Sequence, residues 1–126
     1  MELIILSYND EQKRDLKVES KYGKFNVLWE GELPLLGEKI DVELDIDQHL
    51  IWNKDIYLSM NDELQIKQSE EETIIQGKLE EVSDAGFAVL RLGNSIITFI
   101  TEGTAFPINS NIQIKVVNVT AYPIDY

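Results

Sequence analysis

The chain of 126 residues has the length of one domain, and its 44% hydrophobic content is ordinary for a folded protein. It has no cysteine, which excludes disulfides, thiolate metal sites and a thiol nucleophile. The formal net charge of −12 disfavours nucleic acid and anionic membranes as partners and favours a basic protein.

Strand patterns begin at the start of the chain. The apolar run at 2–8 lacks a basic leader and is too short to span a membrane, so we predict a strand and a soluble, cytoplasmic protein. Alternating segments predict further strands at 15–20 and 25–30, with a hairpin tip at Gly23 between them. A segment rich in glycine and proline, 31–37, indicates a loop.

The next segment, 38–49, alternates between aliphatic residues and carboxylates. Side chains in a strand point alternately to opposite faces, whereas a helix would scatter these carboxylates around its axis. The segment therefore predicts a strand with one buried face and one hydrated face. The aliphatic set is Ile40, Val42, Leu44 and Ile46, and the acidic set, named here the acidic row, is Asp41, Glu43, Asp45 and Asp47.

Two hairpins are predicted in the second half of the chain. The first covers 56–67 and turns at Asn61-Asp62. The second covers 87–100 and turns at Gly93-Asn94. Both faces of the second hairpin are largely apolar, so we expect both to be covered, the outer one by the N-terminal half. The predicted pairs are Leu92 with Ser95, Leu90 with Ile97, Ala88 with Phe99, Arg91 with Ile96, Val89 with Thr98, and Phe87 with Ile100.

The last segments complete the expected fold. A strand is predicted at 73–82, and 112–119 is predicted to close the sheet. The alternation of 112–119 changes parity at Val116-Val117, which is typical of a strand that crosses to another sheet. We therefore predict a single all-β domain of about nine strands without a substantial helix. It is either a sandwich or an OB-like barrel with additional N-terminal strands, and it divides into an N-terminal sheet (1–68) and a barrel (73–126).

Residues 73–125 resemble a small five-stranded barrel of the OB type. The resemblance rests on the glycine-containing strand "TIIQGKLEEV", the hairpin "FAVLRLGNSIITFI" and the closing segment "NIQIKVVNVTAYPID". The helix that usually joins the third and fourth strands is absent, and the acidic charge departs from nucleic-acid-binding members. The resemblance therefore implies a fold and no nucleic-acid site.

The whole chain is similar in size, charge and all-β character to small acidic bacterial immunity proteins. Such proteins neutralise a basic toxin domain by covering its active site. The similarity implies an inhibitor of a basic protein partner, without identifying that partner.

Catalytic, metal and nucleic-acid sites find little support in the sequence. With one histidine, no cysteine and no nucleophile or phosphate-binding motif, we predict no enzyme activity and no cofactor. Asp45, Asp47 and His49 are weak candidates for a metal site, because neighbours on one strand lie about 7 Å apart and do not converge on one ion. A few basic and aromatic residues could bind nucleic acid on a small barrel, but the rest of the chain is strongly negative. These residues are Lys78, Arg91, Lys115 and Phe87.

The acidic row is the preferred binding site. Carboxylates on a strand can dock lysines and arginines, while a few buried anchors supply the remaining affinity. We consider Trp29 and Trp52 as such anchors. The alternative interpretation is that each ring is buried in the core. The alternative function is a small-molecule or carbohydrate-binding β domain, with a cleft near Trp52 and Tyr57.

Overall fold

The computed structural model describes residues 1–124, and in this range it has twelve β-strands and no helix. The prediction of a single all-β domain is confirmed. The strands outnumber the expected count because several are only two to four residues long. One cluster of buried apolar side chains extends through strands of the whole chain. Residues 1–124 also contain no helix that could cross a membrane.

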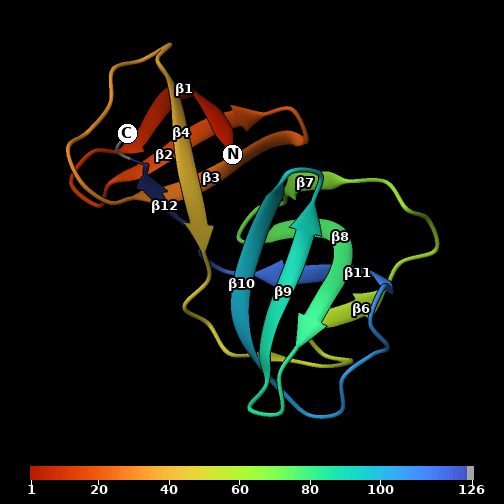
Figure 1. Ribbon diagram of the computed structural model, residues 1–126. Coiled ribbons are helices and arrows are strands. Elements are labelled where there is room, and N and C mark those ends of the chain that lie inside the picture. The colour runs from red at the N-terminus through yellow and green to blue at the C-terminus, as the bar shows by residue number, and fades with distance from the viewer. Residues whose placement is uncertain (125–126) are drawn as a thin grey trace.

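Five strands form a small closed barrel (Figure 1). They hydrogen-bond in the order β1-β2-β3-β12-β4, and β4 pairs with β1 to complete the ring. Strand β12 is parallel to β3 and antiparallel to β4, so a late segment of the chain completes a barrel of early ones. The barrel strands are β1 (Glu2–Asp10), β2 (Asp15–Ser20), β3 (Gly23–Trp29), β4 (Lys39–Asp45) and β12 (Thr120–Pro123).

The other strands form a curved sheet beside the barrel, drawn at the lower right of Figure 1. Their order is β10-β9-β8-β11-β6, with β5 paired to β10 and β7 paired to β8. These strands are β5 (Leu50–Ile51), β6 (Ile56–Leu58), β7 (Gln65–Gln68), β8 (Thr73–Val82), β9 (Phe87–Leu92), β10 (Ser95–Glu102) and β11 (Asn111–Val116).

The place of the barrel corrects the sequence prediction. The range 73–125 contributes only β12 to the closed ring, and the other four barrel strands lie within residues 1–45. The division at residues 68 and 73 therefore does not separate the barrel from the second sheet. Local alternation could not reveal this arrangement, because it does not show which distant strands pair.

The barrel and the second sheet meet at the end of β4. There β4 pairs in parallel with β10, through Leu44 with Ile97 and Asp45 with Thr98. The chain passes from the second sheet to the barrel after Val116, as the change of parity predicted. The four-residue connector after β4 lies beside this crossing. Its Gln48 side chain accepts a hydrogen bond from the Val117 amide at 3.0 Å.

Of the two predicted hairpins, one is confirmed and one is wrong. All six predicted pairs between β9 and β10 are present. The segment 56–67 does not form a hairpin, because β6 pairs with β11 and β7 pairs with β8. The loop between them is held by the Gln76 side chain, which donates to Asn61 Oδ1 at 2.7 Å and to the Glu63 carbonyl at 2.8 Å.

Candidate functional site

Asp41, Glu43 and Asp45 of the acidic row lie on the outer face of the barrel, as the alternation predicted. Its aliphatic neighbours Val42, Leu44 and Ile46 are at most 5% exposed and belong to the core. Strand β4 ends at Asp45, so Asp47 lies in the connector that leads to β5.

The connector brings two carboxyl groups of the row together. Burial raises the pKa of Asp45, and a hydrogen bond from the Ile46 amide lowers it. The nearby Asp47 carboxyl raises the pKa again, both through its charge and through a hydrogen bond between the two side chains. The row thus ends in a close carboxyl pair, where an extended strand would hold the two groups about 7 Å apart.

Replacing Asp45 with asparagine should stabilise the protein at pH 7. A carboxyl whose pKa is raised by folding binds its proton more tightly in the folded state, so its ionised form opposes folding at neutral pH. The effect should disappear as the pH falls through the raised pKa. A like-charge pair near the surface is worth about 0.2–1 kcal/mol, or at most a few degrees in Tm.

Thermal unfolding from pH 7 to pH 3 measures this difference. The control is Asp84→Asn, at an exposed residue in the turn between β8 and β9. If Asp45→Asn gains no stability over this control at pH 7, then neither burial nor Asp47 disfavours the ionised Asp45 carboxyl in the folded protein.

Tyr122 on β12 borders the acidic row. It is paired with Glu43 across the strands, and 40% of the residue is exposed. Partial burial raises the pKa of its phenol, and the charges of Glu30, Asp45 and Asp47 raise it further. An aromatic ring therefore lies within the field of the carboxylates.

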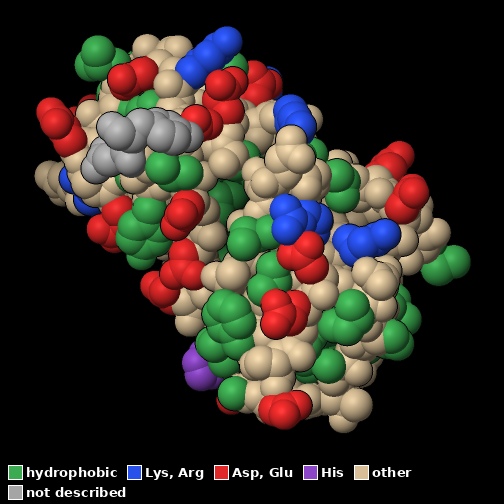
Figure 2. All heavy atoms as spheres, in the orientation of Figure 1, with side chains coloured by type: hydrophobic (Ala, Val, Ile, Leu, Met, Phe, Trp, Pro, Cys, Tyr) green, Lys and Arg blue, Asp and Glu red, His purple; other side chains and the backbone are tan. Residues whose placement is uncertain are grey.

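On its other side, the end of the row adjoins exposed apolar side chains, which we name the apolar stripe: Phe87, Ile96 and Ile100. Ile96 and Ile100 flank Thr98, the partner of Asp45, and are 46% and 37% exposed. Phe87 lies opposite Ile100 on β9 and is 43% exposed. In Figure 2, apolar and acidic side chains lie next to each other on the face that carries β9 and β10 in Figure 1.

The exposure of the apolar stripe corrects a prediction. The outer face of the β9–β10 hairpin was expected to be covered by the N-terminal half. Instead, the N-terminal strands close into the barrel, and Phe87, Ile96 and Ile100 stay exposed. Glu43 and Ile96 line the same hollow of about 220 Å³, so the acidic row and the stripe form one continuous surface.

Two of the three cations considered for nucleic-acid binding have partners within the protein. Arg91 makes two hydrogen bonds to the Glu80 carboxylate, at 3.1 and 3.0 Å, at the β9 edge of this surface. The ammonium of Lys115 lies 5.3 Å from the centre of the Tyr57 ring. Lys78 is exposed on β8 and pairs across the strands with Arg91, so it adds a positive charge at this edge of the surface.

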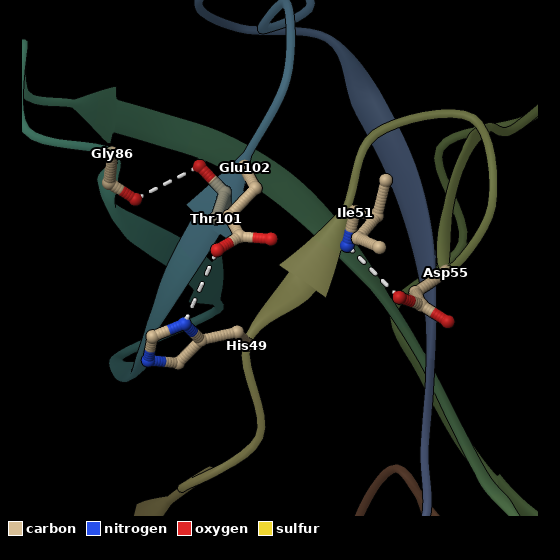
Figure 3. Close-up of polar contacts among 6 residues, drawn as sticks. All are labelled: His49, Ile51, Asp55, Gly86, Thr101 and Glu102. Atoms are coloured by element: carbon tan, nitrogen blue, oxygen red, sulfur yellow. Dashed lines mark hydrogen bonds and ion pairs between the residues drawn. The ribbon is translucent and has the colours of Figure 1, made fainter.

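The His49 side chain contacts a carboxylate on β10. At the start of β5 it turns its ring toward β10, where Nδ1 is 3.6 Å from Glu102 Oε1 (Figure 3). Within the described chain, no three His, Asp or Glu side chains come together to hold a metal ion. Asp45, Asp47 and His49 do not form such a group.

Both tryptophans lie in the core, so the proposal that they anchor a partner is corrected. Trp29 is 1% exposed, and its Nε1 donates to the Glu32 carbonyl at 2.9 Å. Trp52 is 5% exposed, and its ring packs edge-on against Phe106 with 5.0 Å between centroids. Trp52 thus offers no open ring for a sugar or another small molecule.

Comparison of the chain with protein-family models, curated proteins and solved structures found no match. The exposed aromatic and apolar side chains beside the acidic row are Tyr122 and the apolar stripe, in place of the two tryptophans that the sequence suggested. The residues of the stripe could have been found from the sequence, because they alternate onto the outer face of their predicted strands. Tyr122 could not, because its position depends on the pairing of β12 with β4, which no local pattern predicts.

Proposed function

We propose that the chain is a non-catalytic protein-binding module that docks on a basic partner. The proposed surface, named here the docking face, lies on the outer side of β12, β4, β10 and β9. The single observation that supports this function best is the exposed apolar stripe in register beside the carboxylates. The docking face comprises Glu43, Asp45, Asp47, Tyr122, Phe87, Ile96 and Ile100.

This combination has the properties of a protein interface. Apolar and aromatic side chains supply most of the affinity, and charges at the rim raise the association rate and select the partner. The four strands are separated by three spacings of about 4.8 Å, so the face is about 14 Å wide. The net charge of −12 would accelerate encounter with a basic surface.

We further infer that the closed barrel is OB-like and that the chain acts as an immunity-type inhibitor. Within the ring, the fifth strand lies between the third and fourth, which fits the Greek-key order of small OB barrels. The second sheet is then an insertion between the fourth and fifth barrel strands. An inhibitor of this type would place the docking face over the functional site of its basic target.

Binding to purified basic proteins encoded beside this chain tests the proposal. The key variant reverses three charges, with Glu43, Asp45 and Asp47 each replaced by lysine. At 0.1 M salt, we expect the association rate to fall by about tenfold or more, and the difference to shrink at 1 M salt. Phe87→Ser and Ile96→Ser should mainly accelerate dissociation.

A matched variant controls for net charge. It replaces Glu70, Glu71 and Asp84 with lysine, at exposed positions outside the docking face. If both triple variants lose binding equally, only overall charge matters. If none of the basic proteins binds, or the docking-face variant binds as well as the unmodified protein, the proposed function is wrong.

A further inference from the structure

A groove lies at one end of the barrel, next to the docking face. It is formed by the loop between β3 and β4 and by the end of β12, and it has a volume of about 810 Å³. Its lining includes the buried Trp29, the partly buried Ile40 and the exposed Tyr122. Because Tyr122 belongs to both surfaces, the groove continues the docking face.

The loop that forms the groove is held by several hydrogen bonds. The Tyr8 hydroxyl donates to the Pro34 carbonyl, and Trp29 Nε1 donates to the Glu32 carbonyl. The Gly37 amide donates to the Ile5 carbonyl at 2.7 Å. A groove held in this way needs little ordering when it binds, which lowers the entropic cost of association.

The lining of the groove combines apolar surface with negative charge. The apolar lining includes Leu35, which is 73% exposed. Three glutamates also line the groove: Glu30, Glu32 and Glu38. The described residues that line it include no lysine or arginine. The Glu38 carboxylate already accepts a hydrogen bond from the Leu35 amide at 3.0 Å, so Glu30 and Glu32 are the better placed to meet a ligand.

We propose that this groove binds an extended segment of the basic partner, with an arginine side chain laid over Tyr122 and an apolar residue against Leu35. This inference rests on the proposed function. A guanidinium can stack on an aromatic ring while it donates hydrogen bonds to carboxylates, and its aliphatic stem can cover apolar surface. The Tyr122 phenol already lies in the field of Glu30, Asp45 and Asp47, so a cation placed there would meet several negative charges.

NMR titration with a blocked peptide, acetyl-Leu-Arg-Leu-Arg-amide, tests the groove alone. The amide signals that shift should be those of the non-proline residues in 30–40, together with Ala121 and Tyr122. The same peptide with citrulline in place of arginine keeps the shape and loses the charge, and it should bind about tenfold more weakly.

Two groove variants complete the experiment. Tyr122→Leu removes the ring face, and Glu30→Gln with Glu32→Gln removes two charges. Each should weaken binding of the arginine peptide by about three- to tenfold. The charge-matched control is Glu70→Gln with Glu71→Gln, outside the groove, and it should leave binding unchanged. The amide spectrum of each variant confirms that it is folded.

Three results would overturn the inference: no binding at millimolar peptide, equal binding of the citrulline peptide, or equal loss in the groove and control variants. The outcome is separable from that of the proposed function. If the basic protein binds through the docking face and Glu30→Gln with Glu32→Gln does not weaken it, the groove inference alone is wrong.

Discussion

Replacing Trp29 with alanine should lower the free energy of unfolding by about 3–5 kcal/mol. The side chain is 1% exposed, and the smaller residue would leave a cavity at the end of β3. It would also remove the hydrogen bond from Nε1 to the Glu32 carbonyl that holds the groove loop. The predicted loss is a large share of the roughly 5–15 kcal/mol that stabilises a typical domain. Urea unfolding followed by far-ultraviolet circular dichroism measures it.

Trp29→Phe is the matched control. It retains most of the buried ring and loses the Nε1 donor, so it should cost clearly less than alanine, about 1–2 kcal/mol. If Trp29→Ala keeps full stability and loses only partner binding, the ring is an interface anchor after all, and its place in the core is wrong.

Replacing Gly86 with alanine should cost about 2–6 kcal/mol of stability. Its φ angle of +87° is unfavourable for alanine, and strain of this kind costs about 1–3 kcal/mol. An added Cβ would also overlap the Thr101 carbonyl oxygen, and overpacking costs a further 1–3 kcal/mol or so. The close approach is held by two hydrogen bonds from Thr101 to the Gly86 carbonyl, one from its amide and one from its hydroxyl, the second of which is drawn in Figure 3.

Gly31→Ala separates the two causes. Gly31 has a similar φ angle of +92°, and a Cβ built on it meets no atom within 4 Å. Urea unfolding should therefore show a loss from strain alone, smaller than the loss at Gly86. Equal losses would mean that the Thr101 contact adds nothing. Because Gly86 precedes Phe87, the variant should also disturb the apolar stripe.

Features set by neighbours in sequence could be predicted. The two-residue turn at Gly93-Asn94 determined every pair between β9 and β10, because side chains alternate and the turn length fixes the register. In the same way, alternation placed Val42 and Leu44 in the core and the acidic row outside. Both results follow from backbone geometry within a few residues.

Pairings between distant segments could not be predicted. Strand β12 lies between β3 and β4, although most of the chain separates it from both. The segments around Asn61-Asp62 carried the pattern of a hairpin, yet each found a longer partner in β8 or β11. An alternating pattern predicts a strand but does not identify the strand that pairs with it. Several strands of this chain could have been the partner.

The site was predicted in part, for the same reason. The acidic row could be predicted from alternation alone. The exposure of the side chains beside it could not, because it depends on which faces the fold leaves open. Tryptophan is common at interfaces, but Trp29 and Trp52 are both buried in the core. Phe87 and Ile96 suit a core, but closure of the barrel left them exposed.

The position of β12 has a consequence for synthesis of the protein. The first four barrel strands are complete at Asp45, and the fifth begins at Thr120. At about 5–20 residues per second, a ribosome takes roughly 4–15 s to make the stretch between them. During that time the edges of β3 and β4 lack their partner and can pair with other chains. The second sheet can therefore fold before the barrel, although the ribosome makes four of the five barrel strands first.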